Sequence, residues 1–92
     1  MNYTIETNRI YLENKDGKLL AEITFPAVKN NLVDINHTFV DSSLRGQGIA
    51  GELLSLTATE LRNSGRKAVL SCSYADYWFK KHPENADLLA LV

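Results

Sequence analysis

The chain has 92 residues, 45% hydrophobic and 23% charged, and its ten Lys and Arg against eleven Asp and Glu leave a net charge of −1. This composition indicates one folded domain, residues 1–92, which is too apolar for disorder and lacks the basic balance that binds nucleic acid. The single cysteine excludes an internal disulfide and the two histidines lie well apart, so we expect no metal site.

The N-terminus has neither the basic start nor the apolar run of a signal peptide. No stretch approaches the ~18 apolar residues of a membrane-spanning helix. We therefore expect a cytoplasmic protein without a membrane partner.

The first elements in the chain are β-prone. Residues 3–12 predict a strand with a bend at the polar residues 7–9. Asp16-Gly17 then supplies the positive φ of a tight hairpin turn, and the alternation over residues 19–25 predicts its second arm. Pro26 ends regular pairing, and residues 27–31 are expected to be a connection.

A third strand is predicted over residues 32–40. The period of two places four side chains on one face: Val33, Ile35, His37 and Phe39. His37 is therefore expected among apolar neighbours. It is either a half-buried histidine satisfied by a hydrogen bond or a proton acceptor that titrates near neutral pH.

Arg45-Gly46-Gln47-Gly48 follows this strand and leads into a helix. Glycines at 46 and 48 let an anion approach the backbone, and the helix N-terminus adds free N–H donors and a partial positive charge. Such a turn, with Arg45 as a nearby cation, suits a pyrophosphate. The alternative is a tight turn that uses glycine for its permissive φ and binds nothing.

The helix extends to about Asn63 and stops at Ser64-Gly65, and residues 68–72 predict a central buried strand. Strand, helix and strand imply a parallel crossover, with a ligand expected at the carboxyl ends of the two strands. Cys72 lies at that end. In such a strand it is either a small hydrophobe or, because of its place beside the cleft, a reactive group.

A final helix is predicted over residues 74–82, capped by Ser73 and ended by Pro83. Its aromatic residues include Trp78, which we expect in the core. The apolar tail after residue 84 is expected to dock on the sheet or to meet a partner.

Arg45-x-x-Gly48-x-Ala50 resembles the pyrophosphate motif of the GNAT superfamily of N-acetyltransferases, Gln/Arg-x-x-Gly-x-Gly/Ala. The whole chain resembles very small bacterial members that lack the first two helices of larger acetyltransferases. The matching segments are residues 21–25, His37-Thr38, residues 44–48, Cys72, His82-Pro83-Glu84 and Asp87-Leu88-Leu89. The resemblance implies an α+β fold: a mixed, twisted, mostly antiparallel sheet that splays around a central pyrophosphate-binding helix, with a C-terminal helix.

The resemblance also implies acetyl-CoA as co-substrate, with no metal. The residues expected to bind it are Val40, Arg45, Gly46, Gln47, Gly48, Ile49 and Ala50. A backbone N–H near residues 39–41 would stabilise the oxyanion, as it does in the superfamily.

If the protein transfers an acetyl group to an amine, three residues are candidates for the catalytic roles. His37 would take the amine proton, and Cys72 would protonate the departing thiolate or accept the acetyl group. Tyr74 is a further candidate acid, with Tyr77 as an alternative, because Phe79 stands where many larger members have the tyrosine that protonates the thiolate. Ser73 replaces a proline that relatives often carry, which puts the chain direction at Cys72 in question.

Two alternatives to an enzyme stay open: a non-catalytic module that binds acetyl-CoA or CoA, and an interaction domain that kept only the fold. The arginine and the glycine spacing at residues 45–50 argue against the second. The sequence identifies no particular amine acceptor, and a monomer or a weak homodimer is expected.

Overall fold

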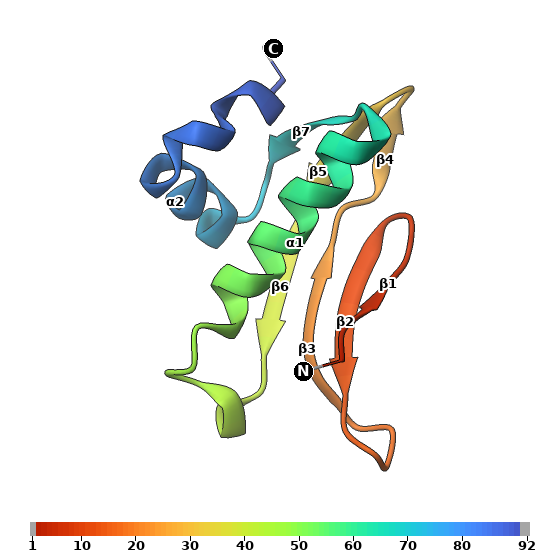
Figure 1. Cartoon of the computed structure of the whole chain (residues 1–92), viewed down its shortest axis with the longest axis vertical. Helices are drawn as coiled ribbons and strands as arrows, with labels where there is room; N and C mark the ends of the chain where they lie inside the picture. Colours follow the sequence, from red (N-terminus) through yellow and green to blue (C-terminus); the bar gives the residue numbers. More distant parts are fainter. Residues whose placement is uncertain (1, 91–92) are drawn as a thin grey trace.

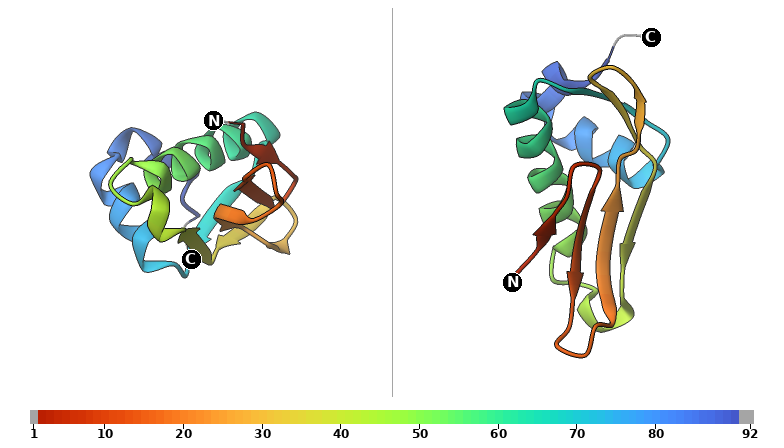
Figure 2. Two further views of the ribbon diagram at one scale, coloured as in Figure 1. Left: turned by 90° about the horizontal axis from the view of Figure 1, so that it is seen from below. Right: turned by 90° about the vertical axis from the view of Figure 1, so that its right-hand side faces the viewer.

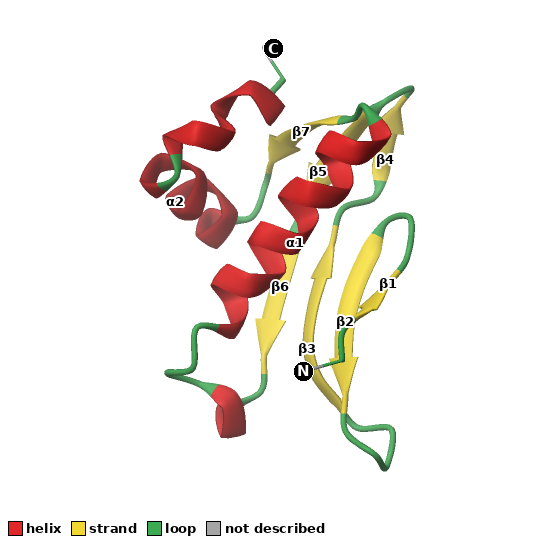
Figure 3. Cartoon of the chain, in the orientation of Figure 1, coloured by secondary structure: helices red, strands yellow, loops and turns green. Residues whose placement is uncertain are grey.

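A computed structural model describes residues 2–90 of the chain, an α+β structure with two sheets and two α-helices (Figures 1 and 3). The strands are β1 (Thr4–Ile5), β2 (Arg9–Glu13), β3 (Leu19–Thr24), β4 (Ala27–Lys29), β5 (Leu32–Ile35), β6 (His37–Val40) and β7 (Lys67–Leu70). The helices are α1 (Ile49–Ser64), α2 (Ser73–Lys81) and the 3₁₀ segments η1 (Ser42–Leu44) and η2 (Pro83–Leu88). One sheet has the order β1-β2-β3-β6 and the other β4-β5-β7.

The first predicted strand is in fact two. The chain reverses after β1, where the N–H of Glu6 donates to the carbonyl of Arg9, and β1 pairs antiparallel with β2. The next hairpin is confirmed: Gly17 has φ +82°, and the Asn14 side chain accepts from the N–H groups of Asp16 and Lys18. Residues 27–29, expected to be a connection, form the edge strand β4, which pairs with β5.

The third predicted strand is interrupted at Asn36, and this changes which side chains face the core. The Asn36 N–H donates to the Thr24 carbonyl, and its side-chain oxygen accepts from the Thr24 hydroxyl. Asn36 and His37 are both exposed in succession, so the alternation shifts by one residue from β5 to β6. The expectation that His37 lies among apolar neighbours is therefore wrong.

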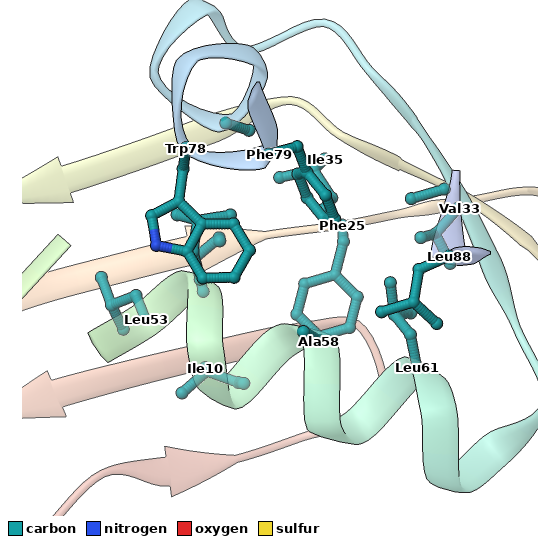
Figure 4. Close-up of a cluster of buried hydrophobic side chains, with 14 of the residues drawn as sticks. Ile10, Phe25, Val33, Ile35, Leu53, Ala58, Leu61, Trp78, Phe79 and Leu88 are labelled. Atoms are coloured by element: carbon teal, nitrogen blue, oxygen red, sulfur yellow. The ribbon is translucent and has the colours of Figure 1, made fainter. Parts of the chain in front are cut away.

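Helix α1 lies along one face of the strands and encloses the core with them (Figure 2). Its buried side chains include Leu53, Leu54 and Leu61. Leu53 and Leu61 belong to the same core cluster as Ile10 of β2 and Phe25, the residue after β3 (Figure 4). Helix α2 contributes the buried rings of Trp78 and Phe79, which pack edge to face with centroids 5.1 Å apart. Trp78 is thus the core residue that the sequence predicts.

The parallel crossover is confirmed, because β5 and β7 pair in parallel on either side of α1 in the sequence. The pairing ends where the carbonyl of Ile35 accepts from the N–H groups of Ser71 and Cys72, at 3.1 and 3.0 Å. Beyond that point β6 pairs with β3, whereas the segment that follows β7 turns into α2. The two strands therefore splay, as the resemblance implied.

The ends of α2 also differ from expectation. Cys72, not Ser73, is its N-cap, and the Asp76 N–H donates to the Cys72 carbonyl. The tail docks on the sheet: Leu88 is buried, and the Ala90 N–H donates to the carbonyl of Ala68 in β7. Residues 91 and 92 lie outside the described part of the chain. No helix within residues 2–90 is long and apolar enough to cross a membrane.

Candidate active site

The turn between β6 and α1 is built by local hydrogen bonds and two left-handed glycines. The Asp41 carboxylate caps η1 by accepting from the N–H and hydroxyl of Ser43, and these bonds hold the pKa of Asp41 below its usual value. Gly46 and Gly48 have φ +83° and +74°, a region that other residues rarely adopt. Gly48 is the N-cap of α1, so the turn presents the open N–H groups of that helix.

This turn borders a pocket of about 240 Å³. Six of the seven residues predicted to bind the cofactor line it: Val40, Arg45, Gly46, Gly48, Ile49 and Ala50. Gln47 does not line the pocket, whereas Leu44, Gly51 and Tyr74 do. Among residues 2–90 no carboxylate pairs with the Arg45 guanidinium. The pocket therefore combines helix N–H groups with an available cation, which is the chemistry of an anion site.

A larger groove of about 800 Å³ continues from this pocket between α1 and α2. The two share Gly51 and Tyr74. Other lining residues are Tyr3, Glu52, Ser55, Leu56, Tyr77, Trp78, Lys81 and His82. The aromatic side chains in this groove can stack on a planar ligand, and Lys81 places a cation beside them.

The polar groups of the groove have defined partners. The Tyr3 hydroxyl donates to Glu52 at 2.8 Å, and burial together with that carboxylate raises the pKa of Tyr3 well above its usual range. The His82 ring stacks on Trp78, with centroids 4.2 Å apart, and its Nδ1 lies 2.8 Å from the Trp78 carbonyl oxygen. These contacts join the N-terminal segment to α1 and fix His82 on α2.

The vertex of the splay carries Cys72, which is partly buried. Its sulfur lies 3.5 Å from the Thr38 hydroxyl, and this contact joins β6 to the start of α2. The Asp41 N–H donates to the Leu20 carbonyl, and in an antiparallel ladder the preceding N–H then points away from that partner strand. The N–H of Val40 is therefore directed from β6 toward the splay.

The structure separates the three predicted catalytic residues. Cys72 lies at the vertex beside Thr38, and Tyr74 lies where the pocket and groove join. His37 is on the opposite face of β6 from Thr38, with its side chain 51% exposed and its Nε2 3.5 Å from a Glu22 oxygen. Thr38 is the contact that sequence reasoning missed, because an unbroken alternation would place it on the face away from the core. Phe79, which stands where many larger family members have a tyrosine, is buried in the core.

The sequence profile of a family described as GCN5-related N-acetyl-transferase matches residues 9–88. This chain belongs to the GCN5-related N-acetyltransferase family. Among solved structures, a GCN5-like candidate N-acetyltransferase from Staphylococcus aureus has 31% identity and a TM-score of 0.80, over 99% of this chain and 89% of that protein. The Staphylococcus aureus protein is thus similar in length to this chain. No curated protein matches the chain.

Larger GNAT proteins share the fold at lower identity. The ribosomal-protein-S18-alanine N-acetyltransferase of Escherichia coli has 21% identity and a TM-score of 0.64, over 87% of this chain and 51% of that protein. A Mycobacterium tuberculosis protein solved with CoA has 18% identity and a TM-score of 0.64, over 83% of this chain and 47% of that protein. The chain therefore spans about half the length of these relatives.

Proposed function

We propose that this GNAT protein binds acetyl-CoA with its pyrophosphate on residues 45–50 and transfers the acetyl group to an amine. The observation that carries the proposal is the pocket at the N-terminus of α1, where Gly46 and Gly48 leave the backbone open and Arg45 adds charge. The pocket lies between the end of β6 and Tyr74 of α2. A pantetheine arm would run from it into the splay, and the nucleotide end would enter the aromatic groove.

The reaction has a defined balance of bonds and protons. The amine nitrogen forms a bond to the thioester carbon, the carbon–sulfur bond breaks, and the CoA thiolate takes up a proton. The N–H of Val40 would donate to the developing oxyanion. Cys72 would supply the proton to the thiolate, or would carry the acetyl group in a two-step route, and His37 would receive the amine proton.

The alternative function is a non-catalytic module that binds acetyl-CoA or CoA. The burial of Phe79 favours it, since an apolar core residue occupies the place of the acid that many larger family members use. Both functions require the same cofactor pocket. They differ in whether free CoA accumulates when an amine is added.

Calorimetric titration with acetyl-CoA, followed by CoA, tests the cofactor binding that both functions require. Arg45→Glu places a negative charge beside the pyrophosphate, so we expect it to abolish saturable binding while the far-UV circular dichroism stays unchanged. Lys29→Glu is the matched control, because it makes the same charge change on the edge strand β4, outside the pocket. Equal affinity of Arg45→Glu and the unaltered protein would reject the proposal.

Two further measurements separate binding from transfer. Trp78 is the only tryptophan and lines the groove, so its fluorescence should change on titration with acetyl-CoA. Release of free thiol, followed with a panel of primary amines, then measures turnover. Binding without thiol release for any amine would support the non-catalytic module.

A further inference from the structure

The outer face of the β2-β3-β6 sheet, opposite α1, carries a chain of charged side chains across three neighbouring strands. Arg9 Nε on β2 lies 2.5 Å from Glu22 Oε2 on β3, and His37 Nε2 on β6 lies 3.5 Å from Glu22 Oε1. The register explains the contacts, because Glu22 pairs with Tyr11 on one side and with Phe39 on the other. Arg9 and His37 are the diagonal neighbours of Glu22 on the same face.

This arrangement is more ordered than a typical exposed ion pair. The side chain of Glu22 is only 17% exposed, and each of its oxygens faces a different nitrogen. The Arg9 guanidinium lies 3.8 Å from the centroid of the Tyr11 ring, which limits its freedom. Forming the Arg9–Glu22 ion pair therefore costs less side-chain entropy than forming an ion pair between two freely mobile surface side chains.

The position of His37 links this cluster to the splay. His37 follows the break at Asn36, and its neighbour Thr38 contacts Cys72 from the other face of β6. One segment thus presents a hydroxyl to the thiol and an imidazole to the outer face of the sheet. His37 is exposed on that outer face and is the chain neighbour of Thr38, which contacts Cys72 at the vertex.

We propose that Glu22 is a positioning residue for acetyl transfer, acting through His37; this inference rests on the proposed function. With Nε2 turned toward the Glu22 carboxylate, Nδ1 of the neutral ring is left to accept the amine proton. The new N–C bond forms, the C–S bond breaks, and the positive charge that appears on His37 lies beside the Glu22 carboxylate. Arg9 holds that carboxylate in place through its contact with Oε2.

The charged groups around His37 favour this role. Glu22 faces it from β3, and Arg9 from β2 lies on the far side of Glu22. Glu6, 3.8 Å from Arg9, adds a second carboxylate to the cluster. The cluster therefore holds two carboxylates and one guanidinium, and the carboxylate of Glu22 is the one that faces the His37 ring.

A double-mutant cycle on turnover tests the proposal. Glu22→Gln keeps the size and an oxygen acceptor but removes the charge, so we expect kcat/KM at neutral pH to fall by about 3- to 10-fold. The affinity for acetyl-CoA should change by less than about twofold, because Glu22 does not line the pocket and its side chain lies on the outer face of the sheet. In a His37→Gln background the Glu22 substitution should have no further effect on kcat/KM. An equal loss in both backgrounds would overturn the proposal.

Glu13→Gln is the matched control, since Glu13 is an exposed acid at the end of β2. It should leave kcat/KM unchanged. The two kinetic constants add a readout that a structural role would not move: in Glu22→Gln kcat should fall while KM for acetyl-CoA stays within about twofold. A higher KM with an unchanged kcat would contradict the proposal.

Carbethoxylation of His37, followed by mass spectrometry, tests the pairing without substrate. Glu22→Gln should change the reaction rate of His37 severalfold, because in the unaltered protein the Glu22 carboxylate faces Nε2 of this ring. His82 is the internal reference. If the unaltered protein shows no turnover but the reactivity difference is present, the proposed function fails and the Glu22–His37 coupling stands. If turnover is present and the reactivity is equal, the positioning role fails.

Discussion

Thr38 and His37 are adjacent in β6, so their side chains lie on opposite faces of the strand. The break at Asn36, which is held by two hydrogen bonds to Thr24 twelve residues earlier, decides which of the two faces the core. As a result Thr38, not His37, contacts Cys72. Among the contacts within residues 2–90, none joins His37 to Cys72.

The Thr38 hydroxyl is expected to tune the thiol. Thr38→Val keeps the shape and removes the hydroxyl, whereas Thr38→Ser keeps it. If the hydroxyl donates to the sulfur, alkylation of Cys72 by iodoacetamide should slow by about 2- to 5-fold in the valine variant, because a hydrogen bond contributes ~1 kcal/mol or less. The serine variant should retain most of the rate. Equal rates in all three proteins would show that the contact is only packing.

Cys72→Ala addresses the catalytic role itself. If the thiol protonates the leaving group or carries the acetyl group, thiol release with an amine should fall by ~100-fold or more, while calorimetry gives nearly unchanged affinity for acetyl-CoA. A covalent acetyl adduct on Cys72, detected by intact mass, would select the two-step route. Full activity in this variant would make Cys72 a core residue.

At the scale of elements, α1 begins and ends with glycines in the same conformation. Gly48 at its N-terminus has φ +74° and Gly65 at its C-terminus has φ +69°. A Cβ at either position would meet nothing within 4 Å. The two sites therefore have equally open surroundings, but only Gly48 borders the candidate pyrophosphate pocket.

This symmetry allows a matched pair of substitutions. Gly48→Ala and Gly65→Ala should each lower the free energy of unfolding by about 1–2 kcal/mol, because both force a side chain into the left-handed region. Only Gly48→Ala should also weaken acetyl-CoA binding, since a shift of the helix start would misalign its N–H groups. Urea denaturation and calorimetry provide the two measurements. Similar affinities in the two variants would argue against pyrophosphate binding at this turn.

At the scale of the whole molecule, the C-terminal segment is fastened to α1 as well as to the sheet. Arg62 on α1 pairs with Asp87 in η2 at 2.6 Å, and Lys67 of β7 donates to the Asp87 carbonyl. Behind this pair Leu88 is buried. The last turn therefore closes one end of the core.

The Arg62–Asp87 pair predicts a pH dependence of stability. The hydrogen bond and charge of Arg62 hold the pKa of Asp87 below its usual value, so the folded state binds this proton less readily than the unfolded state. The stabilisation is present above the unfolded pKa of ~4 and is lost as the pH falls through the lower folded value. Asp87→Asn should therefore lower Tm at pH 7, and the two proteins should converge below about pH 3. A Tm difference that persists in acid would assign the effect to something other than this charge.

The sequence by itself determined the features that depend on a few consecutive residues. Asp16-Gly17 specifies a hairpin through its φ preference, Gly65 ends α1, and residues 45–50 combine helix start, glycines and arginine in one turn. Six of the seven residues predicted to bind the cofactor line one pocket for that reason. The parallel crossover was also predictable, because a buried strand on each side of a helix leaves few other arrangements.

Only the tertiary structure decided which faces and which partners those elements have. The reversal between β1 and β2, the edge strand β4 and the break at Asn36 depend on hydrogen bonds to residues distant in the chain, which no local period encodes. The same is true of the Thr38–Cys72 contact and the Arg9–Glu22–His37 cluster. A shift of one residue in a strand reverses every side chain after it, so the faces of His37 and Thr38 could be assigned only once the pairing of β6 with β3 was known.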